Sequence, residues 1–232
     1  NKRFTRMSRL RYYRVFEGLR VATVLTFISG YLNAFTFVTQ SGRFAGVQSG
    51  NVIATAYFLA LGDLGQVVNF CIPILFFALG QFFTYAARKW FLKKGLYWHF
   101  SSSLIMTLLV LLTVLITPLV SHHLTMAPLA FVASIQVETF RKLHGASYAN
   151  VMMTGNVKNA AYLWFMGIME KDRDLQKKGK NILYIITISF MIGVSISTRL
   201  SLIFGEHALT ALLLPLLYVN LQLWYEKNPR TS

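Results

Sequence analysis

Long apolar runs recur along this chain, and they constrain its fold more than any other feature. A transmembrane helix needs about 20 consecutive, mostly apolar residues. Only 13% of the residues are charged, about half the share of a typical soluble domain, so much of the surface must face something other than water. The sequence therefore predicts an all-α polytopic membrane protein. Five runs are long enough to cross a bilayer and a sixth is shorter: residues 18–39, 65–87, 101–120, 181–204 and 207–225, and residues 124–140.

The basic residues are grouped rather than scattered, although the net charge of +15 would by itself also suit a nucleic-acid-binding protein. Short loops rich in Lys and Arg remain in the cytoplasm when a membrane protein inserts. We therefore interpret the charge as a topology signal, with some attraction to anionic headgroups, and expect membrane lipids rather than nucleic acid as partners. The groups hold 20 of the 23 Lys and Arg residues and lie within 1–20, 88–94, 141–142, 171–180 and 227–230.

Two further apolar segments, residues 44–62 and 148–168, separate two topologies. If both cross the membrane, the chain has eight full or partial spans, and 14 of the 20 grouped basic residues are cytoplasmic. If each enters and leaves by the same face, six spans remain, both termini are cytoplasmic, and so are all 20 basic residues. The positive-inside rule favours the second topology. Both segments are long enough to cross as continuous helices, so the eight-span alternative stays open.

A polar interruption in the first of these segments supports the favoured topology. The sequence VQSGNVIATAYFLALG at 47–62 places small and polar residues in an apolar run, which suits a chain break followed by a helix start. A helix from Asn51 to Gly62 has 12 residues and a length of about 18 Å, roughly half of a bilayer core. We therefore expect a re-entrant half-helix, since irregular backbone at membrane depth must be buried in protein or line a wet cavity.

The same pattern returns 105 residues later, as TGNVKNAAYLWFMG at 154–167. We interpret the chain as two repeats, residues 15–122 and 123–228, preceded by a basic cytoplasmic segment, residues 1–14. With three spans in each repeat, the second repeat is inverted relative to the first. Inverted repeats with broken helices that meet near the midplane are a recurring plan of transporters and channels. The matching residues are Gly50/Gly155, Asn51/Asn156, Val52/Val157, Ala56/Ala161, Tyr57/Tyr162 and Gly62/Gly167.

The sequence SGYLNAFTFV at 29–38, together with the two S/T-G-N segments, resembles the YoaK-like family of bacterial membrane proteins, a domain of unknown function. The hallmarks of that family are a G-x-x-[DN]-A element and an [ST]-G-N element, followed by a degenerate second copy with T-G. The second copy departs from the usual G-x-Q-N-A, because residues 134–138 read SIQVE and end in an acid. The resemblance implies a multi-pass protein of the bacterial cytoplasmic (inner) membrane, without a settled activity. The matching residues are Gly30, Asn33, Ala34, Ser49, Gly50 and Asn51 in the first copy, and Thr154 and Gly155 in the second.

Charged residues inside membrane segments are costly and usually functional, and they single out Glu138, Lys158 and Arg199. We expect Arg199 to face the interior and to pair with Glu138 or a bound anion; the alternative is that it snorkels to the interface near its helix end. Lys158 would add to the partial positive charge of a half-helix N-terminus. Asn51 and Asn156 offer donors and acceptors at the crossing of the half-helices, unless they serve only to cap helices that pack through glycines.

We therefore expect a secondary transporter or channel for a small polar or anionic solute, bound where the two S/T-G-N segments cross. Proton coupling through Glu138 is a hypothesis within this interpretation. The rival is a non-transporting membrane scaffold or accessory subunit, whose motifs serve helix packing; a homo-oligomer suits either. Enzyme signatures such as G-x-S-x-G, H-E-x-x-H and paired cysteines are missing, so we expect no enzyme, catalytic residue, metal or cofactor. The candidate solute-binding residues are Asn33, Ser49, Gly50, Asn51, Thr154, Gly155, Asn156, Lys158 and Arg199.

Overall fold

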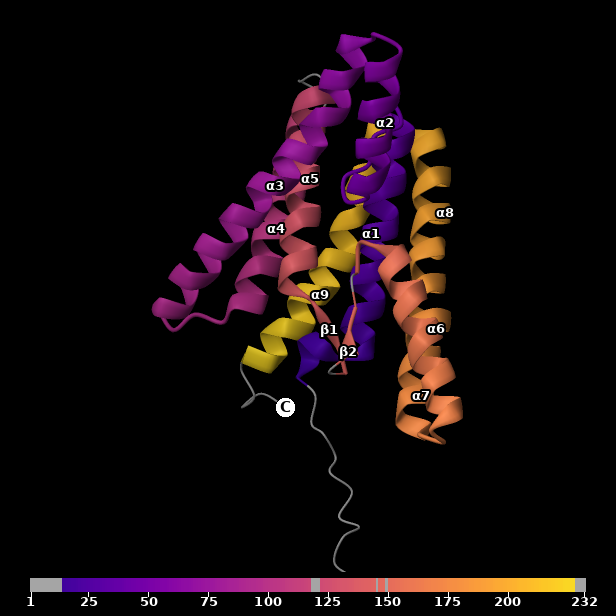
Figure 1. Cartoon of the computed structure of the whole chain (residues 1–232). Coiled ribbons are helices and arrows are strands. Elements are labelled where there is room, and N and C mark those ends of the chain that lie inside the picture. The colour runs from indigo at the N-terminus through magenta and orange to yellow at the C-terminus, as the bar shows by residue number, and fades with distance from the viewer. Residues whose placement is uncertain (1–13, 118–121, 145, 149, 228–232) are drawn as a thin grey trace, which may run out of the picture.

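The computed structural model describes residues 14–117, 122–144, 146–148 and 150–227, which form a bundle of helices with one short antiparallel hairpin (Figure 1). The first part of the chain contains η1 (Val15–Glu17), α1 (Leu19–Thr39), α2 (Gln48–Ala60), α3 (Leu64–Lys93) and α4 (Trp98–Ile116). The second part contains α5 (His122–Thr139), β1 (Lys142–Leu143), β2 (Ala146–Ser147), α6 (Met153–Met169), α7 (Arg173–Lys180), the π-helix η3 (Asn181–Ile186), α8 (Thr187–Phe204), the 3-10 helix η4 (Gly205–Leu212) and α9 (Leu213–Lys227).

Among the described residues, four helical stretches are long and apolar enough to cross a membrane, and α5 contains a shorter apolar helix. The prediction of a helical membrane protein is confirmed. Each predicted run begins within a few residues of the start of a helical element. The reason is that an apolar segment in a bilayer has no water to bind its backbone N–H and C=O groups, and a helix pairs these groups with one another. Residues 1–13 of the predicted basic segment and 118–120 of the predicted run 101–120 lie outside the described part. The four stretches are Leu19–Thr39, Leu64–Lys93, Trp98–Ile116 and Arg173–Glu226.

Helix α1 packs along α8, and small residues allow the two backbones to approach closely. A Cβ atom added at Gly30 of α1 would lie 2.2 Å from the Phe190 carbonyl oxygen, and one added at Gly193 of α8 would lie 2.3 Å from that of Phe27. Ser197 Oγ donates a hydrogen bond across the same interface, to a carbonyl oxygen of α1, at 2.7 Å. A larger side chain at either glycine would therefore push the helices apart.

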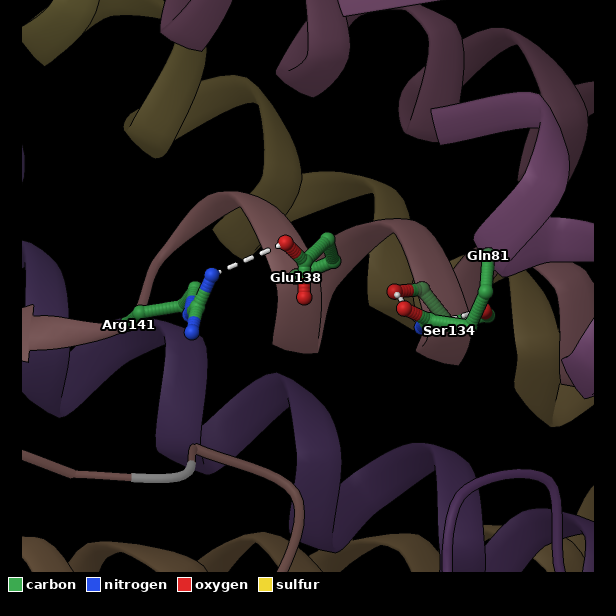
Figure 2. Close-up of polar contacts among 4 residues, drawn as sticks. All are labelled: Gln81, Ser134, Glu138 and Arg141. Carbon is green, nitrogen blue, oxygen red and sulfur yellow. Dashed lines mark hydrogen bonds and ion pairs between the residues drawn. The ribbon is translucent and has the colours of Figure 1, made fainter. Parts of the chain in front are cut away.

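Helix α3 packs along α5 in a similar manner. A Cβ atom added at Gly80 would lie 2.6 Å from Ser134 Cβ, so this crossing also needs a glycine. Gln81 Nε2 donates a hydrogen bond to Ser134 Oγ at 2.8 Å (Figure 2). Ser134 Oγ in turn donates one to the Phe77 carbonyl oxygen at 2.7 Å. The Ser134 hydroxyl group is therefore both a donor and an acceptor in this apolar interface, as expected of a buried polar group.

Helices α4 and α9 pack against each other and complete the bundle. Asn220 Nδ2 donates a hydrogen bond to Thr107 Oγ1 at 2.7 Å between them, with both side chains buried. At one end of the bundle, the Glu226 carboxylate accepts hydrogen bonds from the Val15 backbone N–H, at 3.0 Å, and from the Tyr97 hydroxyl. The start of the described chain and the end of α9 therefore lie at the same end of the bundle (Figure 1).

The same end carries a concentration of positive charge, and we call it the basic end. One cavity beside η1 is lined by three cations: Arg88 near the end of α3, and Arg141 and Lys142 after α5. Lys178 of α7 lies beside His144 of the hairpin turn. Burial, followed by the positive charge of the α7 lysines, lowers the pKa of His144. Segments that are far apart in the sequence thus bring their cations together at one end.

Helices α2 and α6 both begin near the middle of the bundle, and they run toward opposite ends (Figure 1). Helix α2 has 13 residues and a length of about 20 Å, shorter than a hydrocarbon core of about 30 Å. Helix α6 has 17 residues, or about 25 Å. The helix start predicted at Asn51 is wrong by three residues, because α2 begins at Gln48 and no side chain caps it. The S-G-N and T-G-N sequences form first turns rather than preceding them.

Candidate functional site

The irregular segment before α2 is held by two buried asparagine side chains. Asn33 Oδ1, from α1, accepts hydrogen bonds from the backbone N–H groups of Gly46 at 2.8 Å and Val47 at 3.2 Å. Asn51 brackets Phe44, since its Oδ1 accepts from the Phe44 N–H at 3.0 Å and its Nδ2 donates to the Phe44 carbonyl oxygen at 2.7 Å. Both amides therefore give the loop backbone the hydrogen-bond partners that it would otherwise lack, and their contact with a solute stays a prediction.

The segment before α6 is held by residues that the sequence pattern did not single out. Asn150 Nδ2 donates a hydrogen bond to the Phe140 carbonyl oxygen at 2.8 Å, and its Oδ1 accepts one from Gln136 Nε2 at 3.2 Å. The signal that could have found them is Gln136, the glutamine retained in the degenerate element SIQVE. Asn156 is buried in the first turn of α6, where its Nδ2 lies 3.8 Å from Met153 Sδ.

The starts of α2 and α6 meet at a cavity of about 510 Å³, which we call the crossing cavity. Ser49, Thr154 and Gly155, three of the candidate solute-binding residues, line this cavity. A Cβ atom added at Gly155 would meet no atom within 4 Å, whereas one added at Gly50 would lie 2.8 Å from the Phe44 ring. The two glycines are therefore not equivalent. The rest of the lining comes from the two irregular segments and from α2, α3, α6 and α8: Gly46, Val47, Gln48, Phe77, Val151, Met152, Met153 and Phe190.

Two further cavities continue from the crossing cavity toward the basic end. The first, which we call the middle cavity, has a volume of about 370 Å³ and shares Phe77, Met152 and Gly155 with the crossing cavity. The second, the basic-end cavity, has a volume of about 490 Å³ and shares Glu138 and Arg141 with the middle cavity. Because neighbours share lining residues, the three cavities form a row from the basic end to the crossing of α2 and α6.

Glu138 lies where the middle and basic-end cavities adjoin, and it pairs with Arg141 (Figure 2). Arg141 Nη1 lies 3.0 Å from Glu138 Oε1, as the spacing of three residues allows. The Glu138 side chain is 33% exposed and that of Arg141 is 63% exposed. An ion pair with this exposure is screened by water and contributes under about 1 kcal/mol, so it can open at little cost.

The expected inward orientation of Arg199 is wrong. Its side chain is exposed on α8, and Glu138 has the local partner described above. The reason is the rotational phase of the helix: Ser197 and Ser201 are buried, and a residue two positions away from each lies about 200° around the helix. Lys158 of α6 is also exposed. Neither cation lines any of the three cavities in the row.

Arg43, in the irregular segment before α2, is a buried cation that the sequence interpretation did not place in the site. Its side chain is 2% exposed, and its Nε donates a hydrogen bond to the Gln40 carbonyl oxygen at 2.8 Å. Gln40 Nε2 in turn donates one to Glu206 Oε1 at 3.2 Å. These contacts connect the end of α1 with η4, opposite the basic end. The position of Arg43 outside the five basic groups was the signal for it.

No curated protein and no solved structure matches the chain. A family model with the description "Protein of unknown function (DUF1275)" matches residues 21–221, from the first turn of α1 to the middle of α9. This match confirms the family resemblance that the sequence motifs indicated. The chain therefore belongs to the DUF1275 family of proteins of unknown function.

Proposed function

We propose that this protein is a secondary transporter or channel that binds a small polar or anionic solute in the crossing cavity. The observation that carries the proposal is that the starts of two short helices, from different halves of the chain, line one cavity. Its volume of about 510 Å³ lies in the range of about 300–1,000 Å³ that is usual for small-molecule sites. Ser49, Thr154 and Gly155 would contact the solute there.

The two halves are, in this proposal, inverted repeats, and the pairing of their helices supports it. Helix α1 packs on α8, while α5, the counterpart of α1, packs on α3, the counterpart of α8. Each interface is closed by small residues, Gly30 and Gly193 in the first, Ser134 and Gly80 in the second. Exchanging the two halves therefore exchanges the two interfaces. The opposite directions of α2 and α6 are what an inversion requires (Figure 1).

Helices α2 and α6 would be re-entrant, so that six spans cross the membrane and the basic end faces the cytoplasm of a bacterial cell. The positive-inside rule supports this orientation for the bacterial inner membrane, with both termini cytoplasmic. The short length of α2 supports a segment that does not cross. The hydrogen bonds that Asn33, Asn51 and Asn150 make to loop backbone support irregular chain at membrane depth, where water cannot supply partners.

The row of cavities would be the route from the cytoplasm to the solute, and Glu138 stands beside it. A protonated carboxyl group cannot form an ion pair, so protonation of Glu138 would release Arg141 at the point where two cavities adjoin. Since this ion pair contributes little, its opening would add little to the barrier for passage. Glu138 is therefore the residue proposed to couple proton movement to solute movement.

One observation favours a second candidate, a non-transporting membrane scaffold or accessory subunit. The Asn33 and Asn51 amides are engaged with backbone groups, so both residues have a structural role that needs no solute. The crossing cavity, however, is open space between helices. In a protein whose motifs served only helix packing, side chains would fill this space, because protein interiors are close-packed. We therefore rank transport first.

The substitution Gly155→Phe tests the proposal. Because a Cβ atom at this position meets nothing within 4 Å, the ring can enter the cavity without displacing the helices. We expect the full-length variant in proteoliposomes to lose solute flux, measured by stopped-flow light scattering under gradients of glycerol, glycine, phosphate and hexanesulfonate. The matched control, Val157→Phe, places the same ring at a position that is 45% exposed and should retain the flux. Equal flux in Gly155→Phe and the native protein, or no flux above that of protein-free vesicles, would favour the scaffold.

A further inference from the structure

We propose that the solute is an amphiphilic organic anion, whose apolar body occupies the crossing cavity while its acid group binds Arg141 in the adjoining cavities. This inference rests on the proposed function and narrows the class of solute. It follows from a difference in chemistry along the row of cavities, which is apolar at the crossing of α2 and α6 and charged toward the basic end.

The lining of the crossing cavity is mainly apolar. Phe77 of α3 and Phe190 of α8 supply aromatic rings, and the segment before α6 adds Val151 and Met152. Among the described residues that line this cavity, the polar side chains are neutral, and none carries a full charge. A compact ion taken into such a site loses its hydration at a cost of several kcal/mol without a charged partner, whereas an apolar body gains free energy on leaving water. The crossing cavity therefore suits the apolar part of a solute.

The charged residues in the rest of the row of cavities determine which sign of charge on the solute is favoured. Arg88, Arg141 and Lys142 line the basic-end cavity, against the two acids Glu17 and Glu138, so cations outnumber acids. The crossing cavity adds the starts of α2 and α6, and a helix N-terminus carries partial positive charge. Both ends of the row thus favour an anion over a cation of the same shape.

Arg141 is the cation best placed to hold an acid group, because it lines both the middle and the basic-end cavity. One of its nitrogen atoms, Nη1, holds Glu138 Oε1 at 3.0 Å. A guanidinium group has five N–H donors, so the others can hold the oxygen atoms of a solute while the pair with Glu138 persists. The 63% exposure of this side chain leaves it within reach of the cavity contents.

The test is the binding of linear alkanesulfonates to the full-length protein in lipid nanodiscs, measured by isothermal titration against empty nanodiscs. Sulfonates stay anionic at all working pH values. We expect the Kd to fall about fourfold for each methylene from methanesulfonate to hexanesulfonate, the equivalent of about 0.8 kcal/mol per buried methylene. Hexyltrimethylammonium should bind at least tenfold more weakly than hexanesulfonate. A Kd that is independent of chain length, or equal binding of the cation, would overturn the proposal.

Two variants locate the two parts of the solute. Arg141→Gln should raise the Kd for hexanesulfonate about tenfold, as expected for the loss of a charge-assisted hydrogen bond, and should leave 1-hexanol binding unchanged. The matched control, Arg173→Gln, removes the same charge from an exposed position at the start of α7 and should change neither. Gly155→Phe should abolish the dependence on chain length. Unchanged sulfonate binding in Arg141→Gln would overturn the placement of the acid group.

Soluble organic acids and single-chain anionic lipids share this chemistry, and longer chains separate the two sources. A Kd that stops falling at six to eight carbons supports a soluble acid, whereas a Kd that still falls at dodecanesulfonate supports a lipid; both support an amphiphilic anion. Preferential binding of phosphate or of a cation, together with flux that Gly155→Phe blocks, would overturn the solute class and leave the transport function standing.

Discussion

Replacing Asn51 with alanine separates a loop-holding role from a role in solute contact. In the native protein the Asn51 amide makes two hydrogen bonds to the Phe44 backbone, at 3.0 and 2.7 Å, and a third to Gln48 Oε1 at 2.9 Å. If the two backbone bonds are each worth the roughly 0.6 kcal/mol typical between membrane helices, their loss costs about 1 kcal/mol. If the two Phe44 groups are left without partners, at about 2 kcal/mol each, the cost rises to about 4 kcal/mol.

The assay is unfolding by SDS in mixed micelles, followed by tryptophan fluorescence. We expect Asn51→Ala to lower the free energy of unfolding by about 1–4 kcal/mol. The matched control is Asn69→Ala, because Asn69 Nδ2 makes one partly buried hydrogen bond, to Gln66 Oε1 at 3.2 Å. Its loss should cost under about 1 kcal/mol. Equal stability of the two variants would refute the reasoning that Asn51 holds the loop before α2.

Gly193→Ala should lower the free energy of unfolding by about 1–3 kcal/mol, because the added Cβ would lie 2.3 Å from a backbone oxygen of α1; Gly155→Ala, which meets no atom within 4 Å, should leave the SDS midpoint unchanged. Glu138→Gln should abolish pH-driven uptake into proteoliposomes, because glutamine cannot take up or release the proton, and it should leave solute binding largely intact. Unchanged uptake would contradict the coupling hypothesis. Burial raises the pKa of Tyr97, and its hydrogen bond to the Glu226 carboxylate raises it further, so the folded protein keeps a proton that the unfolded chain releases above about pH 10. The free energy of unfolding should therefore fall as pH rises above about 10, and less steeply in Tyr97→Phe; parallel curves for the two proteins would contradict this.

The helices could be predicted because the pattern that specifies each one lies within its own stretch of sequence. A run such as 18–39 is apolar for the length of a bilayer, and helix α1 is the way in which it satisfies its own backbone there. The twin S/T-G-N segments also predicted that two helix starts from different parts of the chain lie together, whereas solute binding there stays a prediction. Ser49, Thr154 and Gly155 do line one cavity.

Other features depend on contacts between segments that no local pattern specifies. Arg199 was expected inside, but the packing of α8 on α1 sets its rotational phase and turns this residue outward. The apolar lining of the crossing cavity comes in part from Phe77 and Phe190, which lie far from both S/T-G-N segments in the sequence. The engagement of Asn33 with Gly46 depends on where an irregular segment folds back. Each of these follows from tertiary packing rather than from spacing.

That the crossing cavity can be reached by a solute from the basic end is tested most directly by cysteine accessibility. The experiment uses a variant in which Cys71 is replaced by alanine and Thr154 by cysteine. An anionic, membrane-impermeant methanethiosulfonate is added to inside-out and to right-side-out vesicles, so that each face of the membrane is tested separately. We expect fast labelling in inside-out vesicles, slowed by hexanesulfonate. We expect no labelling of Val157→Cys, because Val157 does not line the cavity and its exposed side chain would face lipid in the proposed topology. Absence of labelling at position 154 from both faces would contradict a solute site at the crossing of α2 and α6.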